Sequence, residues 1–351
     1  MNKKILYIGW IGYRNLGDDL MWNSFYSLVK KYFASKPITV IPSFPSVNIQ
    51  ELEPYDTVVL GGGSLISPAY IQLLHKAIKM KKKVVIWGSG IDRIPETVLQ
   101  AIQQGKKPPA IQRFKGEEIR QLREVLLKAD FVGVRGPYTK KVLEVLTGVE
   151  TVPIIGDPGL LLTHSSTEAK AKKQIGINWG TTGNNLYGTN EKRLEKELVQ
   201  ATKKLIAKGY QISIYAVWDK DFPACRSFYK QIDDSENVIF EEKLYTEEEL
   251  MKKLSNCLLT INFKLHPNLL SLSAGVPAIA LGYRFKVFDL FSSLDLEHFV
   301  LSTSEEQMDE KIAQLVDTII HEEENIKETY QGKQDVYQPL IEKAFIECFL
   351  W

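Results

Sequence analysis

Short apolar segments alternate with longer, charged segments along almost the whole of this 351-residue chain. The apolar segments predict strands at residues 4–8, 38–41, 57–60, 83–87, 131–134, 151–155, 174–178, 211–216, 238–240, 258–261 and 276–281. The charged segments predict helices, for example at residues 19–33, 117–128, 139–146, 190–208 and 246–255. Strands that alternate with helices of this length form parallel sheets covered by helices. The sequence therefore predicts an α/β fold with doubly wound parallel sheets.

The strands fall into two series, which a polar stretch at residues 165–173 separates. This stretch lacks apolar periodicity, so it is the best candidate for a linker. A chain of this length exceeds one ordinary hydrophobic core. We expect a Rossmann-like N-terminal domain at 1–165, a Rossmann-like C-terminal domain at 174–325 and a cleft between them. The helix at 326–351 is expected to pack back on the N-terminal domain.

Composition narrows the class of partner. Lys and Arg number 44 and Asp and Glu 43, so a net charge of +1 provides no overall field for nucleic acid. Three distant cysteines, without metal-ligand spacing, indicate a reducing compartment and no metal site. No window approaches 18 uncharged apolar residues, so no membrane span is expected. These features predict a cytoplasmic protein, with no indication of oligomeric state. The apolar residues 344–351 could touch the inner face of a membrane, but docking on the N-terminal domain is favoured.

Residues 258–286 carry the clearest functional signal. A strand leads to Lys264 and His266, a helix follows, and a second strand leads to Tyr283, Arg284 and Lys286. Strand ends and helix starts in such βαβ units face one common crevice. Cations and an imidazole would therefore converge there, and the predicted ligand is a small anion. A lone histidine is more often a packing residue, but its cationic surroundings favour function for His266.

The first strand runs into a glycine-containing turn with Asn15, Asp18 and Asp19. Glycines there leave the N–H groups of the following helix open toward an anion. One of the two acids could simply cap this helix. Two acids and an asparagine exceed what a cap needs, so we favour a functional role. The spacing is not that of a dinucleotide site.

Glycines also follow the next strands. Gly61, Gly62 and Gly63 would allow a ligand to approach the main chain, although a tight turn explains them equally. The segment 87–92 has the same character. Arg135 follows a strand and could offer a planar fork to a carboxylate or phosphate, or form a structural salt bridge. For Asp157 we favour an Asx-turn.

Taken in order, these motifs resemble the polysaccharide pyruvyl transferase family over about residues 5–290. The matching pieces lie at residues 12–19, 61–63, 134–139, 156–162, 265–266, 274–277, 283 and 286. The resemblance implies a fold similar to GT-B glycosyltransferases. It also implies transfer of the enolpyruvyl group of phosphoenolpyruvate to a sugar of a glycan precursor, lipid-linked or not, which gives a pyruvate ketal. Lys264 departs from the family, which usually has arginine there; lysine keeps the charge but loses the fork.

From this resemblance we expect Arg135, Lys264 and Lys286 to hold the donor, with no cofactor. His266 would protonate C3 of the donor, and Asp18 or Asp19 would accept the hydroxyl protons. Asn178 and Trp179, at the end of the first strand of the second domain, would line the acceptor side. The Trp179 face could stack a sugar, or the ring could simply belong to the core.

Two rival interpretations remain. A GT-B-like glycosyltransferase could place the diphosphate of a nucleotide sugar in the same cationic crevice. A non-catalytic relative could keep the fold and bind sugars or anions without turning them over.

Overall fold

The computed structural model describes residues 2–163, 173–188 and 190–349. The chain forms two compact units, which are best considered one at a time. The first comprises Met1–Tyr13, Asp18–Leu161 and Gln334–Trp351, and the second comprises Arg14–Gly17 and Leu162–Lys333. These units differ from the predicted domains in three places. The segment Arg14–Gly17 belongs to the second unit, and so do Leu162 and Thr163 and residues 326–333. Most of the predicted linker lies outside the described residues.

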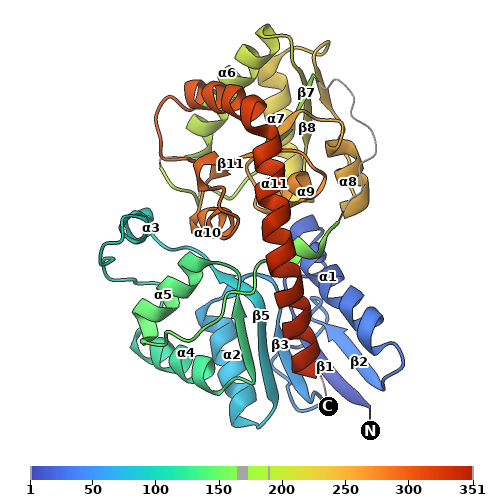
Figure 1. Ribbon diagram of the computed structural model, residues 1–351, viewed down its shortest axis with the longest axis vertical. Coiled ribbons are helices and arrows are strands. Elements are labelled where there is room, and N and C mark those ends of the chain that lie inside the picture. The colour runs from blue at the N-terminus through green and yellow to red at the C-terminus, as the bar shows by residue number, and fades with distance from the viewer. Residues whose placement is uncertain (1, 164–172, 189, 350–351) are drawn as a thin grey trace. The chain divides into compact units, whose positions relative to one another are not determined.

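The first unit is built on one parallel sheet (Figure 1). Its strands are β1 (Lys3–Ile8), β2 (Ile38–Pro42), β3 (Thr57–Leu60), β4 (Gly63–Ile66), β5 (Lys83–Ile91) and β6 (Phe131–Val134). Their order is β2-β1-β3-β5-β6, and β4 pairs with β5 beyond the end of β3. The helices are α1 (Leu16–Phe33), α2 (Pro68–Lys79), α3 (Glu96–Gln103), α4 (Gly116–Lys128), α5 (Pro137–Thr147) and the short 3-10 helix η1 (Pro158–Leu161).

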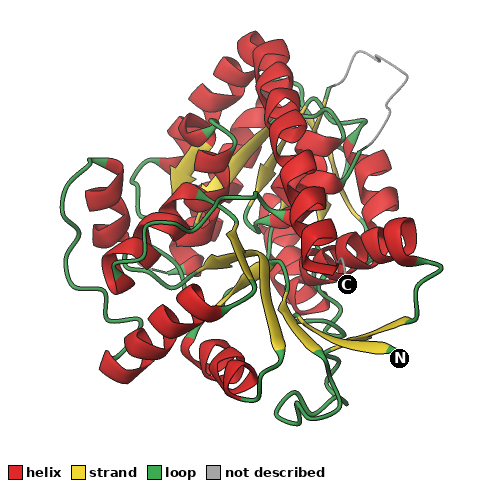
Figure 2. Ribbon diagram, turned by 60° about the horizontal axis from the view of Figure 1, so that its bottom comes forward, coloured by secondary structure: helices red, strands yellow, loops and turns green. Residues whose placement is uncertain are grey.

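The second unit contains the other parallel sheet, in the order β12-β11-β10-β7-β8-β9. Its strands are β7 (Gln174–Asn178), β8 (Gln211–Tyr215), β9 (Val238–Phe240), β10 (Leu259–Asn262), β11 (Ala278–Gly282) and β12 (Val300–Ser302). The helices are α6 (Glu191–Ala207), α7 (Phe222–Ile232), α8 (Glu247–Leu254), α9 (His266–Ser273) and α10 (Phe285–Ser293), with the 3-10 turns η2 (Asp219–Asp221) and η3 (Glu297–Phe299). Helices cover both faces of each sheet (Figure 2).

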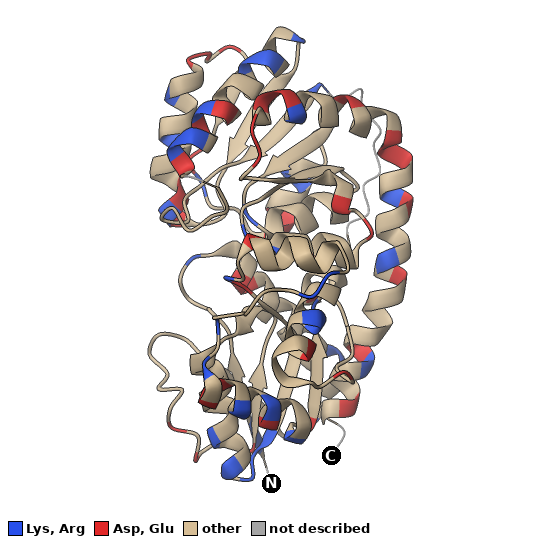
Figure 3. Ribbon diagram, turned by 90° about the vertical axis from the view of Figure 1, so that its left-hand side faces the viewer, with Lys and Arg blue, Asp and Glu red and all other residues tan. Residues whose placement is uncertain are grey.

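The central strands are apolar because both of their faces are covered. All four residues of β3 and of β10 are buried, which is typical of a parallel sheet enclosed by helices. This explains why unbroken apolar runs located the strands correctly. The amphipathic helices instead place their charges outward. In Figure 3 the two signs of charge are interspersed along the helices.

Helix α11 (Met308–Phe349) is one continuous element that contributes to both units. Its residues from Gln334 onward complete the core of the first unit. The indole Nε1 of Trp87 donates to the carbonyl of Ile341 at 3.2 Å, and the rings of Phe25 and Phe345 lie 5.1 Å apart. The predicted helix at 326–351 is therefore the last part of a longer helix. None of the described helices is long and apolar enough to cross a membrane.

Two local predictions were wrong. Residues 151–155 form no strand and contribute only an isolated bridge between Ile154 and Val134. The glycines of segment 87–92 do not form a strand-to-helix turn, because β5 continues through them to Ile91. Gly88 has a φ of 71° at a register shift in β5, which identifies a β-bulge. The bulge brings the Ser89 hydroxyl to the carbonyl of Gly61 at 2.5 Å.

Candidate functional site

In the second unit the predicted site residues gather at the switch point of the sheet. Counted along the chain, its strand order is that of a doubly wound nucleotide-binding sheet, in which ligands bind where the order reverses. That point lies between β7 and β10, which pair side by side. Asn178 ends β7, and Lys264 lies two residues beyond the end of β10. The fold thus brings together residues that are 86 positions apart.

Asn178 holds the two strand ends in place. Its Oδ1 accepts the backbone N–H of Lys264 at 2.9 Å, and its Nδ2 donates to the carbonyl of Tyr215 at 3.1 Å. The side chain is fully buried. Asn178 thus fixes the backbone that carries Lys264, and its predicted contact with substrate stays a prediction.

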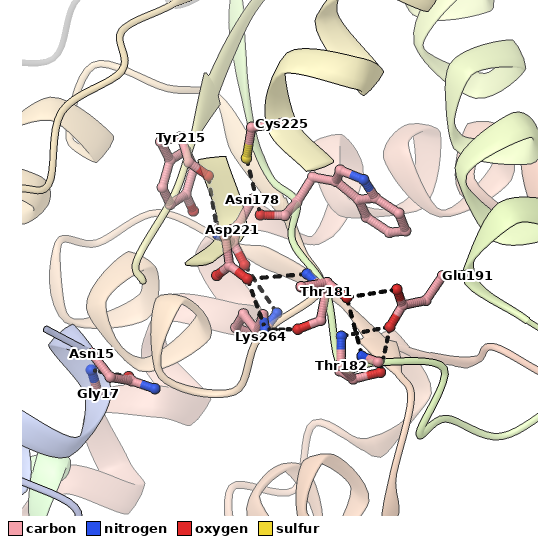
Figure 4. Close-up of polar contacts among 12 residues, drawn as sticks. Asn15, Gly17, Asn178, Thr181, Thr182, Glu191, Tyr215, Asp221, Cys225 and Lys264 are labelled. Carbon is pink, nitrogen blue, oxygen red and sulfur yellow. Dashed lines mark hydrogen bonds and ion pairs between the residues drawn. The ribbon is translucent and has the colours of Figure 1, made fainter. Parts of the chain in front are cut away.

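The ammonium of Lys264 lies in a pocket of protein oxygens (Figure 4). Its Nζ is 3.0 Å from Oδ1 of Asp221 and donates to the carbonyl of Thr181 at 2.5 Å. The side chain is only 14% exposed, whereas Asp221 is completely buried. Lys264 was predicted to hold an anionic donor. Its charge is balanced by Asp221 in this structure, so that role stays a prediction.

Asp221 is a site residue that the sequence did not reveal. Its Oδ1 also accepts the N–H of Thr181 at 3.0 Å. A Cβ atom on Gly180 would lie 2.3 Å from that oxygen, so only glycine allows the carboxylate to approach the loop. Burial raises the pKa of Asp221 above its ordinary value of 3.8, although Lys264 and the Thr181 N–H act in the opposite direction.

A second carboxylate, Glu191, organises the loop that follows β7. It accepts from the hydroxyl of Thr181 at 2.8 Å, from the N–H of Thr182 at 2.5 Å and from the N–H of Asn184 at 3.1 Å. Burial acts to raise its pKa, but these hydrogen bonds hold the pKa below its ordinary value. The loop is therefore fixed at both ends, by Asp221 and by Glu191.

His266 is the first residue of α9 and lies half-buried against the segment Arg14–Gly17. A Cβ atom on Gly17 would lie 1.9 Å from Nδ1 of the imidazole. The segment is held in the second unit by a hydrogen bond from the N–H of Leu16 to the carbonyl of Val217 at 2.9 Å. Gly17 is thus the residue against which the predicted catalytic ring packs.

Asn15, rather than an aspartate, caps α1. Its Oδ1 accepts the N–H of Gly17 at 3.1 Å. The alternative in which Asp18 or Asp19 caps this helix is therefore wrong. Both acids lie in the first turn, where a helix dipole favours negative charge. Asp18 lies close to Gly63 within the first unit, since a Cβ atom on that glycine would be 3.8 Å from its Oδ1. Whether these acids serve as bases stays a prediction.

The aromatic residues at the strand ends form a packed row. Trp179 contacts Phe263 with ring centroids 4.7 Å apart, and Phe263 contacts Tyr283 at 4.8 Å. Trp179 and Tyr283 are each 1% exposed. The face of Trp179 is therefore occupied by protein, which favours the core-packing alternative over sugar stacking. Tyr283 lies below the two cations of the next turn, Arg284 at 4.9 Å and Lys286 at 5.3 Å from its ring centroid.

Of the three consecutive glycines that follow β3, the first two are packed by protein side chains. A Cβ atom on Gly61 would lie 2.1 Å from the hydroxyl of Tyr7, and one on Gly62 would lie 2.5 Å from the sulfur of Met21. Gly63 has a φ of 96° and ordinary contact distances around it. The three glycines thus form the gap between β3 and β4. Only Gly63 keeps the room that an approaching ligand would require.

Arg135 follows β6 and is completely buried. Its Nη1 donates to the hydroxyl of Ser64 at 3.3 Å and lies 3.9 Å from Oδ2 of Asp157. The other oxygen of Asp157 accepts the N–H of Gly159 at 2.9 Å, so the predicted Asx-turn is present. These neighbours match the structural salt bridge that was the alternative for Arg135. A role in binding the donor stays a prediction.

No metal site emerges from this arrangement. Among the described residues, no group of three or more His, Cys, Asp or Glu side chains is placed to hold a metal ion.

Comparison with known proteins identifies the family. Residues 15–284 match the polysaccharide pyruvyl transferase family. The chain belongs to that family. The match contains every predicted site residue except Lys286, which lies two positions beyond its end. A curated relative is the amylovoran biosynthesis protein AmsJ of Erwinia amylovora, 24% identical over 310 residues, which cover 82% of this chain and 71% of that protein.

Solved structures confirm the predicted fold class. MnaA of S. aureus, solved with UDP, is 11% identical with a TM-score of 0.60, over 97% of this chain and 94% of that one. A UDP-glucosyltransferase of Polygonum tinctorium is also 11% identical, with a TM-score of 0.54, over 99% and 98% of the two chains. This member of the pyruvyl transferase family therefore has a GT-B-like fold with two parallel α/β sheets. At these identities the likeness concerns the fold alone.

Proposed function

We propose that this chain transfers the enolpyruvyl group of phosphoenolpyruvate onto a sugar of a polysaccharide or cell-wall glycan precursor and forms a pyruvate ketal. Membership of the pyruvyl transferase family supports the reaction, and the relative named for amylovoran biosynthesis supports a polysaccharide as the product class. The chemistry of the second unit supports the donor.

The observation that carries the proposal is the charge at the starts of α9 and α10. Neither helix has an acidic residue in its first turn. Instead α9 begins with His266, while Arg284 caps α10 and Lys286 lies in its first turn. A helix start that carries basic side chains and open backbone N–H groups favours the binding of an anion. The two helices follow β10 and β11, which are paired neighbours, so their starts lie at the same edge of the sheet.

Phosphoenolpyruvate has a carboxylate and a phosphate that suit this edge. Lys264 is already paired with Asp221, so in our proposal Lys286 carries most of the donor's charge, together with the N–H groups of the two helix starts. The bound dianion stabilises the protonated imidazole of His266. The imidazolium then gives its proton to C3 of the donor, and positive charge develops at C2.

Two acceptor hydroxyls complete the reaction. One attacks C2 as C3 takes the proton, which gives a tetrahedral phosphate intermediate. The second hydroxyl attacks the same carbon, phosphate leaves with the C–O electron pair, and the two hydroxyl protons pass to a base and to solvent. Asp18 and Asp19 remain the predicted bases. One phosphate is released for each ketal that is formed.

Phosphate release from phosphoenolpyruvate in the presence of candidate glycan precursors tests the proposal. His266→Ala should lower turnover about 10²–10⁴-fold, because it removes the proton donor. Affinity for phosphoenolpyruvate, measured by calorimetry, should fall far less. His321→Ala is the matched control, because this exposed histidine of α11 donates locally, from Nδ1 to the carbonyl of Asp317.

The rival interpretations predict other outcomes. Tight binding of a nucleotide sugar without binding of phosphoenolpyruvate would replace the proposal with glycosyl transfer. Sugar binding with no phosphate release, unchanged in His266→Ala, would indicate a non-catalytic relative.

A further inference from the structure

A pocket of about 410 Å³ lies in the second unit between α6 and α7, above the end of β7. Trp179, Gly180 and Thr181 form its floor. One wall comes from α6 and the other from α7; the remaining lining residues are Asn184, Glu191, Lys192, Glu195, Lys220, Pro223, Ala224 and Ser227. The volume is within the range typical of small-molecule sites. None of the predicted donor-binding cations, Lys264, Arg284 or Lys286, lines it.

Two buried polar atoms of the lining lack a partner within the part of the chain that the structure describes. One is the indole Nε1 of Trp179, a residue that is only 1% exposed. The other is Oε1 of Glu195. Leaving a buried polar group without a hydrogen bond costs roughly 1–3 kcal/mol, so such groups usually indicate a ligand or an ordered water.

The two atoms have opposite needs. The indole N–H can only donate, and the carboxylate can only accept. A hydroxyl group both donates and accepts, so one polyhydroxylated molecule can satisfy both atoms. Inorganic or carboxylate anions would meet the carboxylates of Glu191 and Glu195, and a simple cation would meet the indole N–H. The charges of the lining also balance in number, since Lys192 and Lys220 match Glu191 and Glu195.

The lining is held rigidly enough to select a ligand. Glu191 is fixed by Thr181, Thr182 and Asn184, and Glu195 lies one helical turn further along the same face of α6. The indole of Trp179 packs against two other rings. Its centroid lies 4.7 Å from that of Phe263 and 6.1 Å from that of Phe228. The edge of the ring, and not its face, is therefore what the pocket can use.

We infer that this pocket binds a neutral sugar, whose hydroxyl groups accept from the indole N–H of Trp179 and donate to Glu195. The inference that such a sugar is part of the pyruvyl acceptor rests on the proposed function. The binding itself does not.

The experiment observes the indole N–H directly in the full-length protein without any donor. The chain has six tryptophans, so ¹⁵N-tryptophan labelling gives a small set of indole cross-peaks. Trp179→Phe assigns the relevant peak, and substitution of the other tryptophans assigns it by elimination if that variant does not fold. Neutral methyl hexopyranosides are then titrated, with inorganic phosphate and UDP as anionic comparisons. A saturable shift of the Trp179 peak with a methyl hexopyranoside, and not with either anion, is the expected result.

Glu195→Gln tests the second contact. It should weaken binding of the same glycoside about tenfold, because a hydrogen bond to a charged acceptor is replaced by one to a neutral acceptor. Glu197→Gln is the matched control on the same helix; Glu197 pairs with Arg193 at 2.9 Å and is not part of the lining.

Three results would overturn the inference: no saturable shift with any of the glycosides, equal affinity in Glu195→Gln, or displacement of the Trp179 peak by phosphate or UDP. The outcome is separate from that of the phosphate-release assay. Sugar binding in this pocket without phosphate release would contradict the proposed function but support the inference about the pocket. Phosphate release without any shift of the Trp179 peak would support the proposed function but contradict the inference about the pocket.

Discussion

At the residue scale, the contact between Gly17 and His266 is the most specific feature of the site. The glycine is the second residue of α1 and does not have a positive φ, so its backbone conformation is open to any residue. What excludes a side chain is the imidazole, which lies where a Cβ atom would be. A glycine at position 17 therefore determines where the imidazole of His266 can lie, and not the path of the backbone.

Gly17→Ala should separate activity from stability. Alanine favours helices over glycine by up to about 1 kcal/mol, so the free energy of unfolding should change little. The imidazole must move away from its position, so turnover should fall toward that of His266→Ala. Phosphate release and urea unfolding, measured on the same preparations, check this prediction.

Gly116→Ala is the control for this substitution. Gly116 also lies at the start of a helix, α4, but a Cβ atom there would meet nothing within 4 Å. This variant should keep full activity. Full activity in Gly17→Ala as well would mean that the ring position does not matter for turnover.

At the scale of elements, a charged cluster joins α2 to α4 in the first unit. Glu124 of α4 lies 2.6 Å from Lys128 of the same helix, 2.9 Å from Lys79 of α2 and 2.8 Å from His75 of α2. These three partners, Lys128 most strongly, hold the pKa of Glu124 well below its ordinary value of 4.5. His75 thus has a structural role in joining the two helices.

The cluster predicts a pH dependence of stability. A carboxyl group whose pKa is lower in the folded state contributes stability above its unfolded pKa and loses it as pH falls. The difference in unfolding free energy between the wild type and Glu124→Gln should therefore be present at neutral pH and shrink below about pH 4.5. Urea unfolding at a series of pH values measures it. Glu150→Gln, at an exposed residue outside the cluster, is the control, and a difference that grows toward low pH would contradict the assignment.

Elements also show what can be predicted from a sequence like this one. Strands such as β3, β6 and β7 were located to the residue, because buried parallel strands are short apolar runs between polar ones. The strand β4 was missed because the glycines before it resemble a turn. Residues 151–155 are as apolar as a strand, yet they make only one bridge, since apolar content does not reveal whether a neighbouring strand is available.

Site residues could be predicted where they belong to one local sequence motif. They could not be predicted where their contacts join residues far apart in the sequence. Lys264, His266 and Lys286 follow strands within one βαβ unit, and that pattern is visible in the sequence. Asp221 ends the 3-10 turn η2 and Glu191 begins α6, and such single acids give no periodic signal. The partner of Asp221 at Thr181 is 40 residues away, so only the folded chain shows that they meet. For the same reason the sequence left open whether Trp179 stacks a sugar or belongs to the core.

At the scale of the whole molecule, the first unit depends on the far end of the chain. Ile341, Phe345 and Phe349 of α11 are each at most 1% exposed. Phe345 packs on Phe25 at 5.1 Å and on Phe33 at 5.6 Å, both from α1. The end of α11 is thus a core element of a unit whose sheet is encoded more than two hundred residues earlier.

Phe345→Ala should therefore destabilise the first unit selectively. Removal of a fully buried phenylalanine typically costs about 3–5 kcal/mol. Native-state hydrogen exchange should show lost protection in β1, β3 and β5, while β7, β8 and β10 keep theirs. Val336→Ala, at an exposed position of the same helix, controls for changes in helix propensity. Equal loss of protection in both sheets would contradict the division into two units.

This dependence has a consequence for biosynthesis. A ribosome releases the sheet of the first unit early, yet Gln334–Trp351 emerge only after the whole of the second unit. Domains usually fold in the order of synthesis as each one emerges. Here the order is reversed, because the second unit is complete while the first still lacks part of its core. The nascent β1, β3 and β5 must therefore wait with apolar surface uncovered, and a chaperone that binds such surface would be needed most by a chain whose synthesis stalls before Gln334.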